Sequence, residues 1–334
     1  YLSIGAGFVT LFVLAGPVSD PVNVTKLLAA GIVAFGILPI FFNKKSKELI
    51  FSHKLLLGLL ILFILISLMS SLLSKAPFVQ NFYADSGRNT GFLTYFILSL
   101  ILLGSTLISQ SSSFKRILIW FVIAGAINVV LGYWAWILGD PIPWNNIYGN
   151  LLGTFGNPNF QSSFMGMLAV LAAAFTLKSS LKSATRIGSF TLVVSSLVGV
   201  YLTDSIQGFF NFALGFSFIV LFYLISTGRK IFARIMGVLL LFGTLSIVAA
   251  FLNAGPLAEI LYKGSMSARV YYWETAVKIA LDHPSFGVGM DQYVDWLRVY
   301  RTPEQVATNL AADSAHNIYL DVLSGGGFPL FLLF

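Results

Sequence analysis

Long apolar runs alternate with short polar stretches along almost the whole chain. A transmembrane helix needs about 20 mostly apolar residues, and runs of this kind recur from the first residue to the last. The pattern therefore predicts an all-α, polytopic transmembrane helical bundle of about ten spans. The ten apolar segments are residues 1–15, 27–42, 54–73, 91–108, 117–138, 161–177, 188–203, 208–226, 236–253 and 317–334.

One polar stretch is much longer than the others and divides the chain into three parts. Residues 1–253 form the predicted transmembrane bundle with about nine spans. Residues 254–316 form a large loop, which is too long for a plain connector and should contain helices. Residues 317–334 begin a further span that stops at the last residue, so we expect the full protein to extend beyond both ends of this sequence.

The long loop has helical periodicity of its own. Apolar residues at helical spacing predict one helix from Ser267 to the His283-Pro284 dipeptide, and a second amphipathic stretch covers residues 293–300. Thr302-Pro303-Glu304 has the pattern of a helix start with Pro at the first helical position. We expect these amphipathic helices to lie at the membrane surface. The apolar positions of the first helix are Val270, Trp273, Val277 and Leu281.

The basic residues predict how the bundle is oriented. Four alternate loops hold twelve of the 20 Lys and Arg residues and a single acidic residue, Glu48. The positive-inside rule places these loops in the cytoplasm, so the long loop lies on the outer side of the bilayer. The four loops are residues 43–54, 109–116, 178–187 and 227–235.

Composition excludes several classes of protein. Only 10% of the residues are charged, against about 25% in soluble domains, and the mean hydropathy is +0.85. The formal charge of +7 is explained by the loops and does not indicate nucleic-acid binding. The chain has no cysteine, and it has no Walker phosphate loop, His-Glu-x-x-His motif or Asp-x-Asp pair. We therefore expect neither an ATPase nor a metal hydrolase, and no metal or cofactor.

His316 is the histidine best placed for chemistry. It stands at the start of the last apolar segment, after Asp313-Ser314, and therefore near a helix N-terminus. The partial positive charge of that helix end would lower the pKa of the imidazole and keep it neutral, as a general base requires. The alternative is an interfacial histidine that only caps the helix. His53 and His283 lie in a basic loop and a turn, and we expect no chemistry from them.

Two arginines on the outer side could bind an anion. Arg269 falls in the first turn of the first loop helix, where backbone N–H groups and a guanidinium together attract negative charge. Arg88 follows Gly87 just before a span, a flexible setting that suits a lipid phosphate. The alternative for Arg269 is a solvated arginine paired with Glu274 or with a lipid phosphate, and the alternative for Arg88 is ordinary contact with lipid headgroups.

Two polar turns between spans could contact a glycan. Asn157 and Asn159 flank a proline where the chain enters a span from the outer side, and Gln207 lies in the tight turn Asp204-Ser205-Ile206-Gln207-Gly208. Polar groups at membrane depth are costly unless they are paired or used. Their side chains could bind sugar hydroxyls or simply cap the helices that follow.

Several of these motifs together resemble the O-antigen ligase and O-antigen polymerase superfamily. The resemblance rests on His316-Asn317, followed by nine residues and then Gly327, and on the stretch from Ser267-Ala268-Arg269 through Trp273. The segment Asp282-His283-Pro284-Ser285-Phe286-Gly287-Val288-Gly289 and the turn Asn157-Pro158-Asn159 also look like the family's pattern. The similarity extends over about residues 88–334.

The resemblance implies a membrane glycosyltransferase with a GT-C-like helical bundle. Such enzymes move a glycan from an undecaprenyl-diphosphate carrier to an acceptor hydroxyl on the outer face of the bacterial inner membrane, without a metal or cofactor. Carried over, His316 activates the acceptor, while Arg269 and Arg88 hold the diphosphate. Possible glycan or acceptor contacts are Asn157, Asn159, Gln207 and Asn317.

The resemblance leaves the acceptor open and has one departure. Many members have an arginine in a Ser-Arg-Gly turn, where this chain has Gln207, which brings no charge. The acceptor could be a lipid A core, another glycan unit, or a protein such as pilin, as in a ligase, a polymerase or an O-oligosaccharyltransferase. Two other hypotheses are a polyprenol-linked glycan flippase and a transferase that uses a divalent metal on Asp85 or Asp204.

Overall fold

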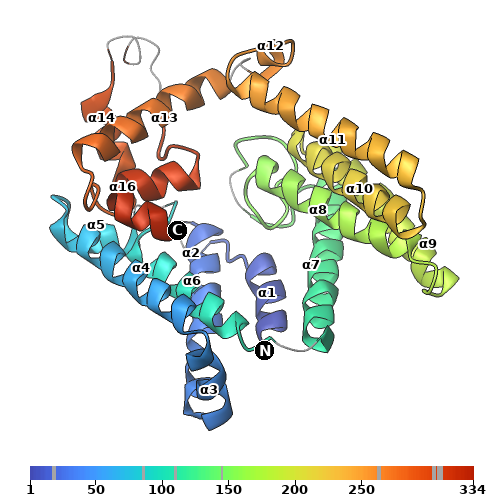
Figure 1. The fold of residues 1–334 in the computed structure, drawn as a ribbon, viewed down its shortest axis with the longest axis horizontal. Helices are drawn as coiled ribbons and strands as arrows, with labels where there is room; N and C mark the ends of the chain where they lie inside the picture. The colour runs from blue at the N-terminus through green and yellow to red at the C-terminus, as the bar shows by residue number, and fades with distance from the viewer. Residues whose placement is uncertain are drawn as a thin grey trace. The chain divides into compact units, whose positions relative to one another are not determined.

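The computed structural model describes residues 1–16, 20–84, 87–108, 111–143, 146–261, 265–302, 306 and 311–334. Within these ranges the regular elements are all helices (Figure 1). They are α1 (Leu2–Leu11), α2 (Asn23–Phe35), the 3₁₀ helix η1 (Leu38–Phe42), α3 (Lys44–Ser52), α4 (Lys54–Leu73), α5 (Phe78–Tyr83), α6 (Phe92–Ser105), α7 (Ser111–Leu138), α8 (Pro158–Leu177), α9 (Ser183–Leu202), α10 (Gln207–Ser226), α11 (Lys230–Phe251), α12 (Ala258–Leu261), α13 (Ser265–Asp282), α14 (Tyr293–Tyr300) and α16 (Ile318–Leu333).

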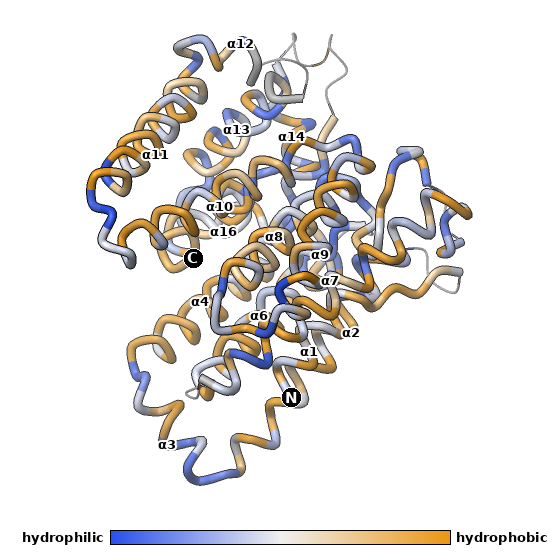
Figure 2. The backbone as a smooth tube through the Cα atoms, turned by 90° about the vertical axis from the view of Figure 1, so that its right-hand side faces the viewer, coloured by the Kyte–Doolittle hydropathy of each residue, from blue (hydrophilic) through white to orange (hydrophobic). Residues whose placement is uncertain are grey.

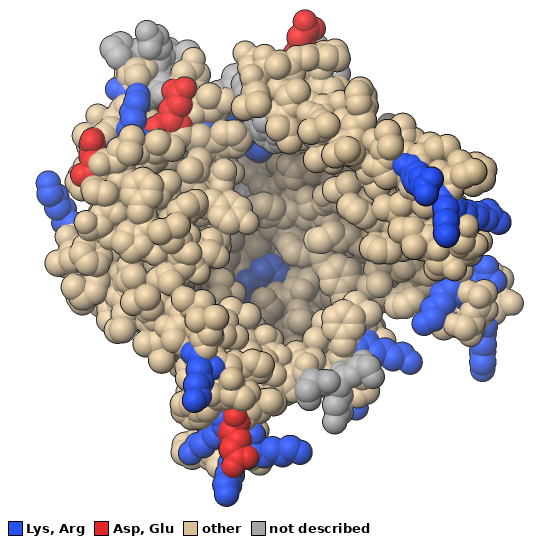
Figure 3. All heavy atoms as spheres, viewed as in Figure 1, with Lys and Arg blue, Asp and Glu red and all other residues tan. Residues whose placement is uncertain are grey.

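The predicted helical membrane protein is confirmed. Among the described residues, 7 helices are long and apolar enough to cross a membrane, namely α2 with its continuation to Ile40, α4, α7, α8, α9, α10 and α11. The other three predicted segments are also helical, as the shorter α1, α6 and α16. Figure 2 shows α11 as mainly hydrophobic with a hydrophilic start, and Figure 3 shows charged side chains gathered in separate groups on a largely uncharged surface.

The chain forms two compact units, each built from two stretches of sequence. The first unit contains residues 1–29 and 110–248, and the second contains residues 30–109 and 249–334. The division follows contacts, and it groups residues 249–334, which include the long loop, with residues 30–109, which include α4, α5 and α6. The predicted linear division stays a prediction.

In the first unit, α8 lies between α9 and α10 and packs closely on both. Gly166 and Gly208 allow the backbones of α8 and α10 to meet: a Cβ on Gly166 would lie 2.3 Å from the Gly208 carbonyl oxygen. Small residues at such crossings are the usual means of helix association in lipid. By contrast, only 6% of the apolar window of α10, and of α11, is buried, so most of their side chains are free to face lipid.

In the second unit, α13, α14 and α16 surround an apolar core. Its buried members are Tyr272, Ala276, Ile279, Val288, Tyr293, Leu297, Ala312 and Ala315. Helices α13 and α14 confirm the two amphipathic helices predicted in the long loop. The predicted helix start at Thr302-Pro303-Glu304 lies largely outside the described residues. Figure 1 shows α13, α14 and α16 together, with α4, α5 and α6 in the same unit.

Helix α16 is not a straight span. Gly327 has a φ of +74°, which breaks the helix, and Pro329 follows with no N–H to donate. The carbonyls left open at the break accept hydrogen bonds from the loop after α13: Val288 N–H to Ser324 at 3.0 Å and Gly289 N–H to Gly325 at 3.0 Å. The Asp282–Gly289 segment and the kink at Gly327 therefore meet in one joint, which holds the middle of α16 against the long loop.

Candidate functional site

His316 lies immediately before the first turn of α16. Asn317 is the N-cap of this helix, and its side-chain oxygen accepts from Tyr319 N–H at 3.1 Å. The oxygen of Asn317 is therefore used for capping. His316 itself has a φ of +50°, in the left-handed region that favours glycine. Its ring is 5.8 Å from that of Tyr272 on α13, between ring centroids.

Arg88, just before α6, holds the His316 segment in place. Its Nη1 donates to Asp313 Oδ1 at 3.0 Å and to Ser314 Oγ at 2.6 Å. Ser314 Oγ in turn accepts from the His316 backbone N–H at 3.1 Å. Thus one hydroxyl links the guanidinium directly to the backbone of His316.

Two further carboxylates face the same guanidinium. Asp291 Oδ1 lies 3.8 Å from Arg88 Nε, and Asp321 Oδ2 lies 4.0 Å from Nη2. Asp321, on α16, also accepts from Ala315 N–H at 2.8 Å. The charge of Arg88 is therefore shared among three carboxylates, and the segment is tied to α16 as well as to α6.

The backbone around this cluster is strained. Asn89, Asp291 and His316 all have positive φ, at 55°, 60° and 50°. Asn and Asp adopt this conformation readily, whereas for histidine it costs about 1–2 kcal/mol, and such strain gathers at functional sites. The Thr90 hydroxyl donates to Asp291, which helps to fix one of the three left-handed residues.

The surroundings of His316 keep its ring neutral. Partial burial is the largest cause and lowers the pKa below its ordinary value of 6.5. Asp313 acts in the opposite direction, whereas Arg88 and Arg269 lower the pKa further through their positive charges. The sequence predicted a lowered pKa from the helix end, and the direction agrees although burial is the main cause. A neutral imidazole at pH 7 can accept a proton.

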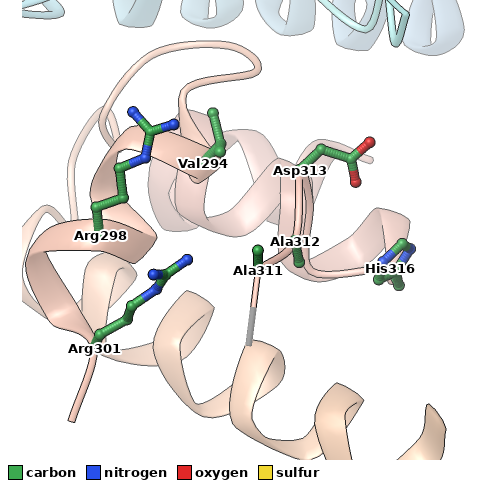
Figure 4. Close-up of a pocket in the computed structure, with 7 residues that line it drawn as sticks. All are labelled: Val294, Arg298, Arg301, Ala311, Ala312, Asp313 and His316. Carbon is green, nitrogen blue, oxygen red and sulfur yellow. The ribbon is translucent and has the colours of Figure 1, made fainter. Parts of the chain in front are cut away.

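His316 lines a cavity of about 350 Å³ in the second unit. The other lining residues are Val294, Arg298, Arg301, Ala311, Ala312 and Asp313. Figure 4 shows the two arginines on one side and Asp313 with His316 on the other, with Ala311 and Ala312 between them. Cations, a carboxylate and a neutral imidazole therefore surround one space.

Arg269 is the fifth residue of α13, because this helix begins at Ser265, two residues earlier than predicted, so Arg269 lies one turn inside the helix rather than in the predicted first turn. It lies one helical turn before Tyr272, whose ring neighbours that of His316, and its positive charge lowers the pKa of the imidazole. His316, Arg88 and Arg269 thus belong to one region of the second unit. The predicted diphosphate contacts of the two arginines stay predictions.

Asn157, Asn159 and Gln207 belong to the first unit. The side-chain oxygen of Asn157 caps α8 by accepting from Asn159 N–H at 2.9 Å, and that of Asn159 accepts from Ser205 Oγ at 2.9 Å. The Gln207 oxygen accepts from Ser163 Oγ at 3.2 Å. These oxygens are engaged within the chain, and their predicted glycan contacts stay predictions.

Sequence reasoning missed most partners of the site. Arg298 and Arg301 were not singled out, although their spacing of three residues on an amphipathic helix was a usable signal. Asp291 and Asp321 carry no local motif, because only the fold brings them to Arg88. In the described ranges, no three His, Asp or Glu side chains form a group that could hold a metal ion. Asp85, one of two suggested metal ligands, lies outside those ranges.

The comparison with protein families agrees with the motifs. Residues 190–334 match the family model described as O-antigen ligase. The match includes Gln207, Arg269 and His316, but not Arg88 or the Asn157-Pro158-Asn159 turn, so it is shorter than the resemblance predicted from about residue 88. No curated protein is similar enough to match the chain. The match covers residues 190–334 of this multi-pass helical membrane protein and supports its relation to the O-antigen ligase and O-antigen polymerase superfamily.

Proposed function

We propose that this protein is a membrane glycosyltransferase that moves a glycan from an undecaprenyl-diphosphate carrier to an acceptor hydroxyl. The family supports an O-antigen ligase or polymerase type of enzyme. The observation that carries the proposal is His316: its imidazole lines a cavity, has a lowered pKa, and sits on a backbone held by Arg88 and Asp321.

His316 acts in this proposal as the general base. The proton of the acceptor hydroxyl moves to the neutral imidazole while the acceptor oxygen bonds to the anomeric carbon. The bond from that carbon to the carrier phosphate breaks, and the diphosphate leaves with the electron pair. General-base catalysis of this kind contributes about 10²–10⁴-fold. The reaction requires no redox step.

Arg269 is the preferred residue for holding the leaving diphosphate. Its guanidinium, one turn inside α13, brings a positive charge that stabilises developing negative charge. The diphosphate role first predicted for Arg88 is less favoured, since Asp313, Asp291 and Asp321 already face its guanidinium. For Arg88 we propose positioning of the His316 segment.

The orientation of the chain is part of the proposal. We infer that the long loop faces the periplasm or outside of the bacterial inner membrane, as the basic loops indicate. Because the sequence has no cysteine, single-cysteine variants need no altered background. An impermeant maleimide applied to intact spheroplasts should label Glu259→Cys and should not label Lys182→Cys. Labelling of Lys182→Cys alone would indicate the opposite orientation, with the long loop in the cytoplasm.

Product analysis tests the function. Purified protein is incubated with undecaprenyl-diphosphate-linked glycan and, separately, with a lipid A core, a second glycan unit or pilin, each with and without EDTA. We expect one acceptor to gain the glycan, with release of the carrier diphosphate, in the presence of EDTA. Loss of transfer in EDTA would favour the metal alternative. Movement of carrier-linked glycan across vesicles without transfer would favour the flippase.

A further inference from the structure

We propose that Arg298 and Arg301 form a site for an anionic group, a phosphate or a carboxylate, on the acceptor sugar. The assignment of this anion to the acceptor rests on the proposed function, because it depends on His316 activating a hydroxyl in the same cavity. Anion binding itself rests only on the cavity and its two guanidinium groups.

The two arginines are placed together by α14. Arg298 lies in the last turn of the helix and Arg301 is its C-cap residue, so both project near the same helix end. The negative end of the helix dipole favours cations there. Arg298 pairs with Asp295 at 3.3 Å, but this pair is exposed, and such pairs contribute little.

Arg301 is the stronger indication of a ligand. Its Nε atom is buried and has no hydrogen-bond acceptor among the residues that the structure describes. A buried charged donor without an acceptor is costly, so an anion in the cavity would remove this cost. Arg88 Nε is also buried without a hydrogen-bond acceptor, but the Arg88 guanidinium already has carboxylates beside it, with Asp313 at 3.0 Å and Asp291 at 3.8 Å.

The shape and chemistry of the cavity suit a small anionic sugar. A guanidinium presents parallel N–H donors that match the oxygens of carboxylate and phosphate groups. Val294, Ala311 and Ala312 add apolar walls, and a lower local dielectric strengthens the attraction between opposite charges. The volume of about 350 Å³ lies at the small end of the ~300–1,000 Å³ range for small-molecule sites.

The position of His316 indicates that the anion belongs to the acceptor. In a direct displacement, the incoming oxygen and the leaving diphosphate lie on opposite sides of the anomeric carbon. The base must lie on the side of the incoming hydroxyl. Since Arg298 and Arg301 share the cavity of the base, they face the acceptor, whereas Arg269 is available for the diphosphate.

Equilibrium binding tests this assignment without needing turnover. Glucose 6-phosphate, glucuronate and glucose are titrated into the purified full chain in detergent. We expect both anionic sugars to bind at least about tenfold more tightly than glucose, as hydrogen bonds to charged groups predict. Arg298→Gln and Arg301→Gln should each weaken the anionic sugars about tenfold. Lys278→Gln, which removes an exposed charge outside the cavity lining, should have no effect.

Several results would overturn the proposal. If glucose binds as tightly as glucose 6-phosphate, the cavity does not recognise an anionic group. If the anionic sugars bind both arginine variants as tightly as the wild type, Arg298 and Arg301 do not form the site. Farnesyl diphosphate is titrated as a short substitute for the carrier. If both arginine variants weaken its binding as much as that of the anionic sugars, the two arginines bind the carrier diphosphate. If Arg301→Gln does not fold, Arg301→Lys and Arg298→Gln decide, with a several-fold loss expected from each.

The failure of this inference is distinguishable from failure of the proposed function. His316→Ala should keep the binding of glucose 6-phosphate, since the arginines remain in place. Transfer that survives in His316→Ala would refute the function and leave the anion site intact. If instead His316→Ala loses transfer while Arg298→Gln and Arg301→Gln bind the anionic sugars as tightly as the wild type, the anion site is refuted and the proposed function is retained.

Discussion

Two helices of this protein begin in the same way but with different residues. Helix α8 starts with Gly156-Asn157 and α16 starts with His316-Asn317. Each asparagine is an extended N-cap whose side chain accepts a backbone N–H, at 2.9 and 3.1 Å. Each preceding residue is left-handed, with φ of +65° for Gly156 and +50° for His316. The backbone shape is therefore shared, and only the residue that adopts it differs.

The difference is what we expect between a structural turn and the functional turn that we propose. Glycine adopts a left-handed backbone at almost no steric cost, whereas histidine loses about 1–2 kcal/mol. At α8 the sequence uses the residue that the geometry prefers, and the nearby oxygens are engaged within the chain. At α16 the strained residue presents an imidazole to a cavity. The strain is consistent with a side chain retained for chemistry.

The largest effect is expected from Gly156→Ala. A Cβ at this position would lie 2.6 Å from Val22 Cγ2, and the backbone is left-handed. Strain and overpacking together predict a loss of about 2–5 kcal/mol in stability. Gly149→Ala is the matched control, because its φ is +68° and no described atom lies within 4 Å of the added Cβ. Thermal unfolding should show a smaller loss there, and equal losses would contradict the role of the Val22 contact.

Arg88→Ala should lower both the stability of the turn before α16 and the rate of transfer that depends on His316. Removing the guanidinium leaves Asp291, which is 6% exposed, and Asp321 without their shared cation. We expect a loss of about 1–3 kcal/mol in stability. The kcat for transfer should fall more than the donor KM rises, because the His316 segment loses its anchor. A large rise in donor KM with unchanged kcat would instead support the diphosphate role of Arg88.

Asn157→Ala tests whether the first turn is only structural. Loss of an Asn N-cap costs about 1 kcal/mol, so the thermal midpoint should fall modestly. Transfer per folded molecule should change little, because the side-chain oxygen serves the backbone of α8. A loss of transfer much larger than the loss of stability would instead support the predicted glycan contact.

The pH dependence gives the smallest and most specific shifts. In the proposed mechanism transfer requires neutral His316, whose pKa is lowered, so the acidic fall in kcat should have its midpoint below the ordinary imidazole pKa of 6.5. Arg269→Gln removes a charge that lowers this pKa, and it should move the acidic limb to higher pH. Asp313→Asn removes a charge that raises the pKa, and it should move the limb to lower pH. Limbs that do not move would exclude His316 as the titrating base.

The helices of this protein follow from local patterns, whereas its site does not. Apolar runs and helical spacing predicted the spans and the loop helices α13 and α14, because each depends on residues within a few turns. His316 and Arg269 were found from helix ends and family motifs. Asp291 and Asp321 were missed, because only the fold brings these distant carboxylates to Arg88. The left-handed backbone of His316 was also missed, because histidine gives no local signal for it.

The most direct test replaces His316 with the residue that α8 uses at the equivalent position. His316→Gly relieves the left-handed strain but removes the imidazole. Glycan transfer and thermal stability are measured on the same purified sample. We predict that transfer falls by about 10²–10⁴-fold, while stability stays within about 1 kcal/mol of the wild type or rises. Transfer near the wild-type rate would contradict the account, because the strained histidine would then have no catalytic role.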